Sequence, residues 1–287
     1  MMWRPVKRIV ERLPMMKTLD LMYMASPTVG RAVTRVWYQH MTRMDKKAQM
    51  VFMNYGYADL DPGCTGLELA TADEEDRYCI QLYHHVAGAV DIEGHDVLEI
   101  GCGRGGGASY VARYLRPNSM TGIDIAAEAV EFCRRHYSVG NLRFEHGDAE
   151  ALPFEDGSFD TVVNVESSHC YASMPRFLAE VRRALRPGGW LLLADRRDRN
   201  GVDTLRNHLV NAGFEVVREK RITDNILRAL DLDEERKQAL IRRGVPWFLR
   251  NMFRQFAATR GTSLYNSFDK GGWEYFSFVL RKTEAAE

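Results

Sequence analysis

Val97–Gly107 reads VLEIGCGRGGG, and this stretch decides the fold. Its first four residues form a short apolar run of the kind that makes a buried strand. Glycines then stand at alternate positions from Gly101, and Ala108–Leu115 has the pattern of a helix. A strand, a glycine turn and a helix in this order bring bare backbone N–H groups close to a ligand. The stretch therefore predicts a small-molecule site within an α/β domain.

The glycine pattern fits two ligand classes. Gly101, Gly103 and Gly106 match G-x-G-x-x-G, which alone indicates a dinucleotide site. However, Glu99 lies two residues before the first glycine, and a second acidic loop, Gly147–Ala149, follows the third expected strand. At these residues the chain resembles the class I methyltransferases that use S-adenosylmethionine (SAM), whose signature is E/D-x-G-x-G-x-G. The remaining alternative is a glycine turn that serves packing alone.

Composition limits the classes of partner. The 287 residues, 45% of them hydrophobic, are enough for one large α/β domain with additions and a full core. The formal net charge is zero, so nucleic acid is not predicted as a partner. Five scattered cysteines have no metal-ligand spacing, and we expect reduced thiols, no metal site and a cytoplasmic protein. No apolar run reaches the length of a transmembrane helix.

The N-terminal part of the chain looks mainly helical. Met1–Met24 interleaves basic and apolar residues without the unbroken apolar centre of a secretory signal. Its spacing predicts an amphipathic helix packed on the domain, and the alternative is peripheral contact with a membrane surface. Pro27–Gln49 and Ala72–Val90 also have helical spacing. We therefore expect residues 1–92 to form a helical N-terminal extension and lid. The sequence predicts no oligomeric state.

Strands and helices alternate from residue 95 onward. The expected strands are 96–100, 119–124, 142–147, 159–165 and 189–195, and the expected helices are 106–115, 126–137 and 174–185. Such alternation predicts a mostly parallel sheet with helices on both faces. Ligands of these sheets bind at the carboxyl ends of the strands. We expect residues 93–223 to form a SAM-binding α/β core.

The alternation is interrupted near the C-terminus. A helix at 202–212 and a strand at 214–223 are followed by Asp224–Gly261, which looks helical and is rich in apolar residues. Glu274–Lys282, EYFSFVLRK, returns to strand character. In the resembled family, a Rossmann-like α/β fold with a seven-stranded sheet, the last two strands form a hairpin and the final strand is antiparallel. We therefore expect 224–261 to be a helical substrate cap inserted before the last strand, with 262–287 completing the core.

The chemistry of SAM makes demands that residues at the strand ends can answer. Asp124 ends an expected strand, and its carboxylate can accept two hydrogen bonds from the ribose diol. Ile125 is then expected to cover one face of the adenine ring. Asp148 can accept a hydrogen bond from the adenine amino group, and the backbone of Ala149 can contact a ring nitrogen.

The methionine end of SAM is assigned to the glycine loop. The backbone of Gly101, Cys102 and Gly103 is expected to hold it, with Glu99 behind the loop. Asn164, near the end of the fourth strand, is expected beneath the sulfonium. Tyr57, in the aromatic and glycine-bearing segment Phe52–Tyr57, is also a candidate cofactor-binding residue.

The reacting end is predicted after the fourth strand, in Val165–Tyr171, VESSHCY. A hydroxyl acceptor gains from a base whose pKa is near neutral, which favours histidine. His169 is the histidine that the strand pattern places at the mouth, so we predict it to be the general base. Glu166 is expected to orient the imidazole or hold substrate. Asp195, at the end of the fifth strand, is expected to assist the base or to pair with a following arginine.

Three short runs narrow the resemblance. ESSHCY, the RPGG turn at Arg186–Gly189 and the tail from Gly261 look like the phthiotriol/phenolphthiotriol dimycocerosates methyltransferase family and, more distantly, natural-product O-methyltransferases. The resemblance implies a SAM-dependent O-methyltransferase acting on a hydroxyl of a lipid, polyketide or related secondary metabolite. The nearest alternative is a sterol-type C-methyltransferase, in which Glu166 and Tyr171 would stabilise a carbocation. An NAD-dependent oxidoreductase and a non-catalytic SAM-binding protein are the alternatives from other classes.

Overall fold

The computed structural model describes residues 50–61, 63 and 66–283. The helices expected in Met1–Met24 and Pro27–Gln49 lie outside these residues, as does most of the expected N-terminal extension. Within the described residues, no helix is both long enough and apolar enough to cross a membrane.

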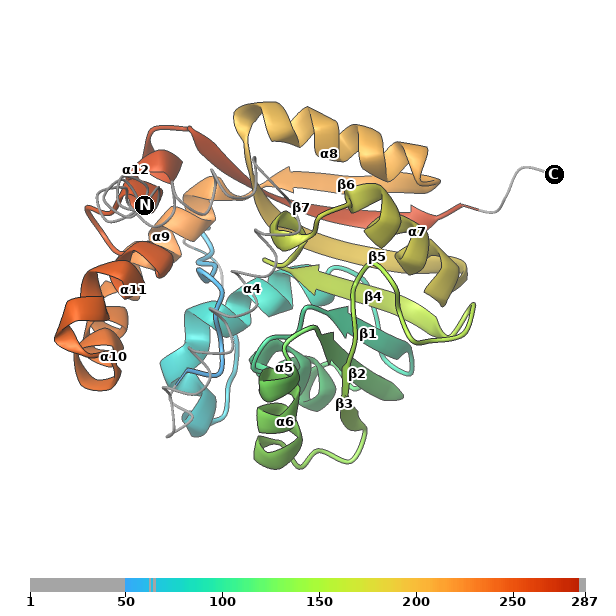
Figure 1. Ribbon diagram of the computed structural model, residues 1–287, viewed down its shortest axis with the longest axis horizontal. Coiled ribbons are helices and arrows are strands. Elements are labelled where there is room, and N and C mark those ends of the chain that lie inside the picture. The colour runs from blue at the N-terminus through green and yellow to red at the C-terminus, as the bar shows by residue number, and fades with distance from the viewer. Residues whose placement is uncertain (1–49, 62, 64–65, 284–287) are drawn as a thin grey trace, which may run out of the picture.

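A seven-stranded sheet in the order β3-β2-β1-β4-β5-β7-β6 forms the centre of the molecule (Figure 1). Its strands are β1 (Asp96–Ile100), β2 (Ser119–Asp124), β3 (Leu142–His146), β4 (Phe159–Val165), β5 (Leu185–Asp198), β6 (Phe214–Arg221) and β7 (Trp273–Lys282). Neighbours among β1 to β5 pair in parallel, whereas β7 runs antiparallel to both β5 and β6. The predicted mostly parallel sheet with a terminal hairpin is confirmed.

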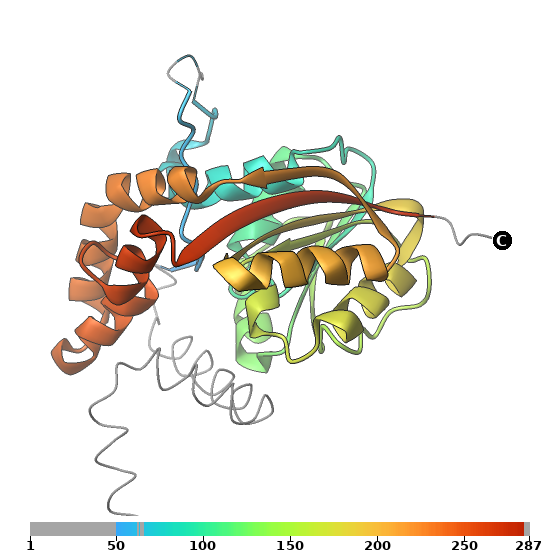
Figure 2. The same ribbon diagram turned by 90° about the horizontal axis from the view of Figure 1, so that it is seen from above.

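Helices cover both faces of the sheet (Figure 2). They are α4 (Arg77–Ala87), preceded by the 3-10 turn η1 (Thr71–Asp76), then α5 (Gly106–Tyr114), α6 (Ala127–His136), α7 (Met174–Ala184) and α8 (Arg199–Asn211). Alternate side chains of a strand point to opposite faces. Along β5, Leu192 packs in a cluster with residues of α4, α5 and α6, whereas Leu191 and Leu193 pack with residues of α7 and α8. The two faces therefore carry separate apolar cores.

The start of β5 differs from the prediction. The helix before it ends at Ala184, but the sheet pairing already begins at Leu185, opposite Phe159. The register then shifts before Trp190, and Gly188 has a φ of +71°. The predicted turn is therefore an irregularity inside the strand. The glycine allows the backbone to change direction there while the pairing continues.

A helical group lies between β6 and β7 and gathers beyond the end of the sheet at which the parallel strands finish (Figure 1). It consists of α9 (Thr223–Leu232), α10 (Glu234–Gly244), the 3-10 turn η3 (Trp247–Leu249), α11 (Arg250–Phe256) and α12 (Ser263–Asp269). Helix α12 falls where the sequence predicts only the return to the last strand. It begins at a capping threonine, because the side chain of Thr262 accepts a hydrogen bond from the N–H of Tyr265. Trp247, which lies in the apolar-rich stretch expected to form the cap, is 79% exposed.

Candidate active site

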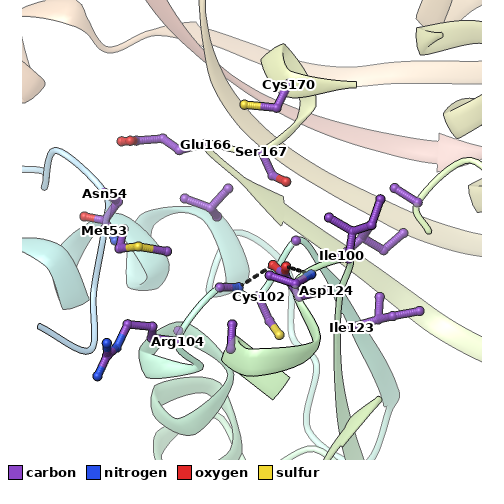
Figure 3. Close-up of a pocket in the computed structure, with 18 of the residues that line it drawn as sticks. Met53, Asn54, Ile100, Cys102, Arg104, Ile123, Asp124, Glu166, Ser167 and Cys170 are labelled. Atoms are coloured by element: carbon purple, nitrogen blue, oxygen red, sulfur yellow. Dashed lines mark hydrogen bonds between the residues drawn. The ribbon is translucent and has the colours of Figure 1, made fainter. Parts of the chain in front are cut away.

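A cavity of about 390 Å³ opens at the carboxyl ends of β1, β2 and β4 (Figure 3). This volume lies in the range of small-molecule sites. The glycine loop, the loops after β2, β3 and β4, Tyr83 of α4 and the segment Val51–Asn54 line it. Figure 3 shows Glu166, Ser167 and Cys170 on one side and Cys102, Asp124 and Arg104 on the other. We call the first three the acceptor side of the cavity.

The glycine loop needs its glycines. Gly101 has a φ of +77° and Gly103 a φ of +53°, a left-handed conformation that residues with a side chain rarely adopt. A Cβ atom on Gly101 would overlap the side chain of Ser167, and one on Gly103 would crowd Met53. The loop therefore presents bare backbone to the cavity, as the sequence predicts.

Asp124 ties the glycine loop to the next helix. Its Oδ2 accepts a hydrogen bond from the N–H of Gly103 and its Oδ1 one from the N–H of Ala126, both at 2.8 Å (Figure 3). Burial raises the pKa of its carboxyl, and these two backbone donors oppose that shift. Asp124 also lines the cavity, so the carboxylate has a structural contact on one side and a ligand space on the other.

Most of the predicted cofactor residues come together. Those that line the cavity are Gly101, Cys102, Gly103, Asp124, Ile125, Asp148 and Ala149. They stand on the ends of three neighbouring strands, which is why a sequence pattern of strands predicts their meeting.

Three predicted cofactor residues do not line the cavity. Glu99 is fully buried behind Tyr83, whose hydroxyl donates to Glu99 Oε1 at 2.6 Å, and burial raises the pKa of Glu99 to about 7. Asn164 is also fully buried, and its Nδ2 donates to the carbonyl of Ile100 and to the hydroxyl of Tyr171, at 2.8 Å each. Glu99 and Asn164 therefore hold residues that line the cavity through hydrogen bonds, and do not line it themselves.

Tyr57 is the third of these, and it lies away from the cavity. Its ring stacks on His85 at 4.4 Å and its N–H donates to the carbonyl of Tyr78. Phe52, Met53 and Asn54, from the same segment, line the cavity instead. The segment has no regular secondary structure, so no periodicity shows which of its residues point inward.

Glu166 lines the acceptor side in a strained conformation. Its φ is +50°, which is uncommon for a residue with a side chain. Oε1 accepts hydrogen bonds from the N–H of Tyr55 at 2.8 Å and the hydroxyl of Tyr275 at 3.0 Å. Burial raises the pKa of Glu166 to about 7. The expectation that it orients the imidazole of His169 is wrong, because its bonds go to the two tyrosines.

His169 is paired with Asp195. The imidazole Nδ1 lies 2.7 Å from Asp195 Oδ1, and the backbone N–H of His169 donates to Oδ2. Asp195 also accepts hydrogen bonds from Ser168 Oγ and the N–H of Arg196, and it is 1% exposed. The predicted partnership of the two strand ends is therefore present, although His169 itself is not among the residues that line the cavity.

The charge of Asp195 decides the protonation of this pair. Burial disfavours an imidazolium, but the charge of Asp195, its hydrogen bond to the ring and the field of Cys170 together outweigh burial and raise the pKa of His169 to about 9. Burial would likewise raise the pKa of Asp195, but His169 and Arg197 hold it well below its usual range. The contact therefore favours the protonated form of the imidazole and the ionised form of the carboxyl.

Arg196 is a charged residue of this region that the sequence analysis considered only as an ion-pair partner of Asp195. It is 6% exposed, and its guanidinium lies 4.4 Å from the ring centre of Trp273. Its Nε is buried without a hydrogen-bond partner among the described residues. The one available signal was its place directly after Asp195 at a strand end.

Comparison with known proteins identifies the family to which this chain belongs. Residues 98–193 match the model of a methyltransferase domain. The fatty-acid O-methyltransferase of Mycolicibacterium smegmatis is 40% identical over 81% of this chain and 84% of its own length. The chain belongs to this methyltransferase family. Its cofactor is SAM, as the sequence predicts, and the predicted resemblance is confirmed. The phthiotriol/phenolphthiotriol dimycocerosates methyltransferase of Mycobacterium tuberculosis is 39% identical over 90% of this methyltransferase and 94% of its own length.

Solved structures agree on the fold. The [4+2]-cyclase SpnF has a TM-score of 0.66 at 20% identity, covering 89% of this methyltransferase and 96% of its own chain. The cyclopropane synthase MmaA2 from Mycobacterium tuberculosis has a TM-score of 0.65 at 16% identity, covering 83% of this methyltransferase and 95% of its own chain.

Proposed function

We propose that this methyltransferase transfers the methyl group of SAM to an oxygen atom of a long-chain lipid. The observation that carries the proposal is the acceptor side of the cavity, where Glu166, Ser167 and Cys170 adjoin the His169–Asp195 pair. The names of the two relatives, a fatty-acid O-methyltransferase and a phthiotriol/phenolphthiotriol dimycocerosates methyltransferase, support an apolar acceptor.

The residues of the cavity fit SAM. The bare backbone of Gly101–Gly103 would hold its methionine end, with Tyr83 and Glu99 behind. Asp124 would accept from the ribose hydroxyls, and Ile125 would cover the adenine. Asp148 and Ala149 would contact the edge of that ring. SAM supplies an electrophilic methyl group on a sulfonium, so the protein has to align the acceptor oxygen and exclude water.

The helical group between β6 and β7 would hold the acyl chain. A second cavity of about 80 Å³ adjoins the first and shares Phe52, Met53 and Asn54 with it. Apolar side chains of α10 and α11 line much of it, among them Leu240, Ile241, Phe253 and Phe256. Apolar walls beside a polar reaction centre suit an amphiphilic acceptor. In this proposal α9 to α11 act as the substrate cap.

Mass spectrometry of a lipid extract incubated with the enzyme and methyl-labelled SAM tests this function. We expect the label in a lipid fraction, linked to oxygen, together with lipid-dependent formation of S-adenosylhomocysteine. Bound SAM without label in any lipid would contradict the proposal. Label linked to carbon would point to the C-methyltransferase alternative.

A further inference from the structure

Glu166 is the carboxylate of the acceptor side, and one of its two oxygens is held in place. Oε1 accepts hydrogen bonds from the N–H of Tyr55 at 2.8 Å and from the hydroxyl of Tyr275 at 3.0 Å. Among the described residues, none donates to the second oxygen, Oε2. Each carboxylate oxygen accepts about two hydrogen bonds, so Oε1 is satisfied. Because Glu166 is half-buried and lines the cavity, Oε2 is left for a ligand.

Glu166 stands where the two cavities meet. The segment Phe52–Asn54 lines both cavities, and Tyr55, which donates to Glu166, lines the second. Figure 3 shows the carboxylate of Glu166 on the side of the first cavity where Met53 and Asn54 lie. An acceptor whose acyl chain occupies the second cavity and whose oxygen faces the first would therefore pass Glu166.

The backbone fixes Glu166 at this point. Strand β4 ends at Val165, and the N–H of Glu166 donates to the carbonyl of Ala194 on β5 at 2.9 Å. The φ of Glu166 is +50°, an unfavourable conformation that persists only where the surroundings impose it. Such positions are common at functional sites, because they aim one side chain in a defined direction.

The surroundings of the carboxylate suit the work of a base. Its two donors are a backbone N–H and a phenol, and neither is a cation. Burial raises the pKa of Glu166 to about 7, the two donors oppose that shift, and the charge of Asp195 adds to it. A base is most effective when its pKa lies near the working pH. The titratable and charged groups that face Glu166 are Tyr55, Tyr83 of α4, His169, Asp195 and Arg196 of β5, and Tyr275 of β7.

The other groups of this region are less suited to take a proton. His169 does not line the cavity, its Nδ1 lies 2.7 Å from Asp195, and this contact favours the imidazolium, which has no lone pair for a further proton. The hydroxyl of Ser167 shares a hydrogen bond with that of Tyr171 at 2.7 Å. The carboxylate of Glu166 is therefore the better acceptor of a proton on this side of the cavity.

Resting on the proposed function, we propose that Glu166 is the general base that removes the proton of an acceptor hydroxyl through Oε2. The hydroxyl oxygen forms the new O–CH₃ bond as the methyl–sulfur bond breaks, and the electrons of that bond go to sulfur and give S-adenosylhomocysteine. The proton moves to Oε2 and passes to water once the products have left. The acceptor is then an alcohol or a phenol, because a carboxylate has no proton to lose.

Glu166→Gln tests the base with two long-chain acceptors. Glutamine keeps the shape and an oxygen for the two donors, but it cannot take up the proton. 1-Hexadecanol has to lose a proton, whereas palmitic acid is already ionised at neutral pH. We expect the native enzyme to methylate 1-hexadecanol and the kcat of Glu166→Gln to be about 10²- to 10⁴-fold lower. The Kd of SAM should be unchanged, and any methylation of palmitic acid should keep its native rate.

Each outcome decides between the inference and its alternatives. A native kcat for 1-hexadecanol in folded Glu166→Gln would overturn the inference. Methylation of palmitic acid without that of 1-hexadecanol would also overturn it and leave the proposed function standing. If neither probe is methylated, the labelled product of the lipid extract decides. A methyl ether whose formation falls in Glu166→Gln supports the base, and a methyl ester overturns it. No oxygen-linked label in any lipid refutes the proposed function as well.

The pH dependence of the native enzyme gives an independent readout. The kcat/KM for the alcohol should rise with pH through about 7, as Glu166 ionises, and then become level. A histidine base would place this rise near 9, the pKa of His169. Tyr275→Phe removes a donor that stabilises the carboxylate, so it should move the rise to higher pH. A rise near pH 9, or the same position in Tyr275→Phe, would contradict the inference.

Infrared spectra of the enzyme without acceptor observe the ionisation apart from catalysis. A protonated carboxyl band should disappear near pH 7 in the native enzyme and be missing from Glu166→Gln. Glu99 has a pKa of about 7 as well, and its band should remain. Glu180→Gln is the matched control, since Glu180 also accepts a backbone N–H, that of Leu152, but lines neither cavity. Loss of the pH-dependent rise in this control, or an unchanged spectrum in Glu166→Gln, would overturn the assignment.

Discussion

Replacing Asp124 by asparagine would disturb one carboxylate that serves two purposes. Asp124 accepts hydrogen bonds from the N–H groups of Gly103 and Ala126, one on each oxygen. Asparagine has the same shape, but one of its two terminal atoms is an NH₂ donor. One backbone N–H would then face a donor and lose its acceptor. The charge that the ribose hydroxyls would meet also disappears.

The magnitude follows from these contacts. A hydrogen bond to a charged group contributes about 1.5–3 kcal/mol, and leaving a buried donor unsatisfied costs about 1–3 kcal/mol. The proposed ribose contact and the altered glycine loop both affect binding, so the affinity for SAM should fall by about 2–3 kcal/mol. This corresponds to a Kd about 30- to 150-fold higher. The free energy of unfolding should fall by about 1–2 kcal/mol through the lost backbone contact alone.

Titration calorimetry with SAM and thermal unfolding without it separate the two effects. Asp160→Asn is the matched control, because Asp160 accepts from the N–H of Asp96 and pairs with Arg186 at the opposite ends of the strands. The control should lose stability but keep its affinity for SAM. A folded Asp124→Asn variant with the native Kd would refute the reasoning, as would an equal loss of affinity in the control.

Three further outcomes are expected. Tyr83→Phe removes the hydroxyl that donates to Glu99, so a buried carboxyl loses its donor and the Kd of SAM should rise about 10-fold in calorimetry. An unchanged Kd would show that Glu99 does not contribute to SAM binding. Phe253→Ala, in the small apolar core of the cap, should lower the free energy of unfolding by about 3 kcal/mol. It should also raise the KM for long-chain acceptors and leave the affinity for SAM unchanged. An unchanged KM would contradict the proposal that the cap binds the acyl chain. The folded state raises the pKa of His169 above 6.5, so the stability from its contact with Asp195 is present below pH 6.5 and lost as pH rises through about 9. The melting temperature should fall over that pH range in the native enzyme and stay level in His169→Gln. The same pH dependence of the melting temperature in both proteins would contradict this link between the protonation of His169 and stability.

The ends of the parallel strands were the most predictable part of the molecule. A buried parallel strand reads as a continuous apolar run, and the residue after it must lie at the carboxyl edge of the sheet. This is why Asp124 and Asp148 could be placed beside the glycine loop, and Asp195 beside the loop that carries His169. The bounds of β1, β2 and β4 agree with the expected strands.

The direction of individual side chains in irregular segments was less predictable. Tyr57 lies in a segment without periodicity, and its stacking on His85 depends on a helix distant in sequence. Glu166 takes a left-handed backbone conformation that turns its carboxylate toward Tyr55 and Tyr275. The burial of Arg196 depends on β7, which pairs with β5 although it lies much later in the sequence, near the C-terminus. No local pattern reports such contacts.

The position of β7 also has a consequence for how the chain folds during synthesis. β5 and β6 each pair with β7 and stand on opposite sides of it in the sheet. Until Trp273–Lys282 has left the ribosome, β6 lacks the strand that it pairs with among the described residues, and β5 has an open edge. Exposed edges of this kind invite pairing with other chains. A nascent chain halted within α9 to α12 should therefore depend on chaperones, and the acceptor side, which includes the Glu166–Tyr275 contact, is completed only with the last strand.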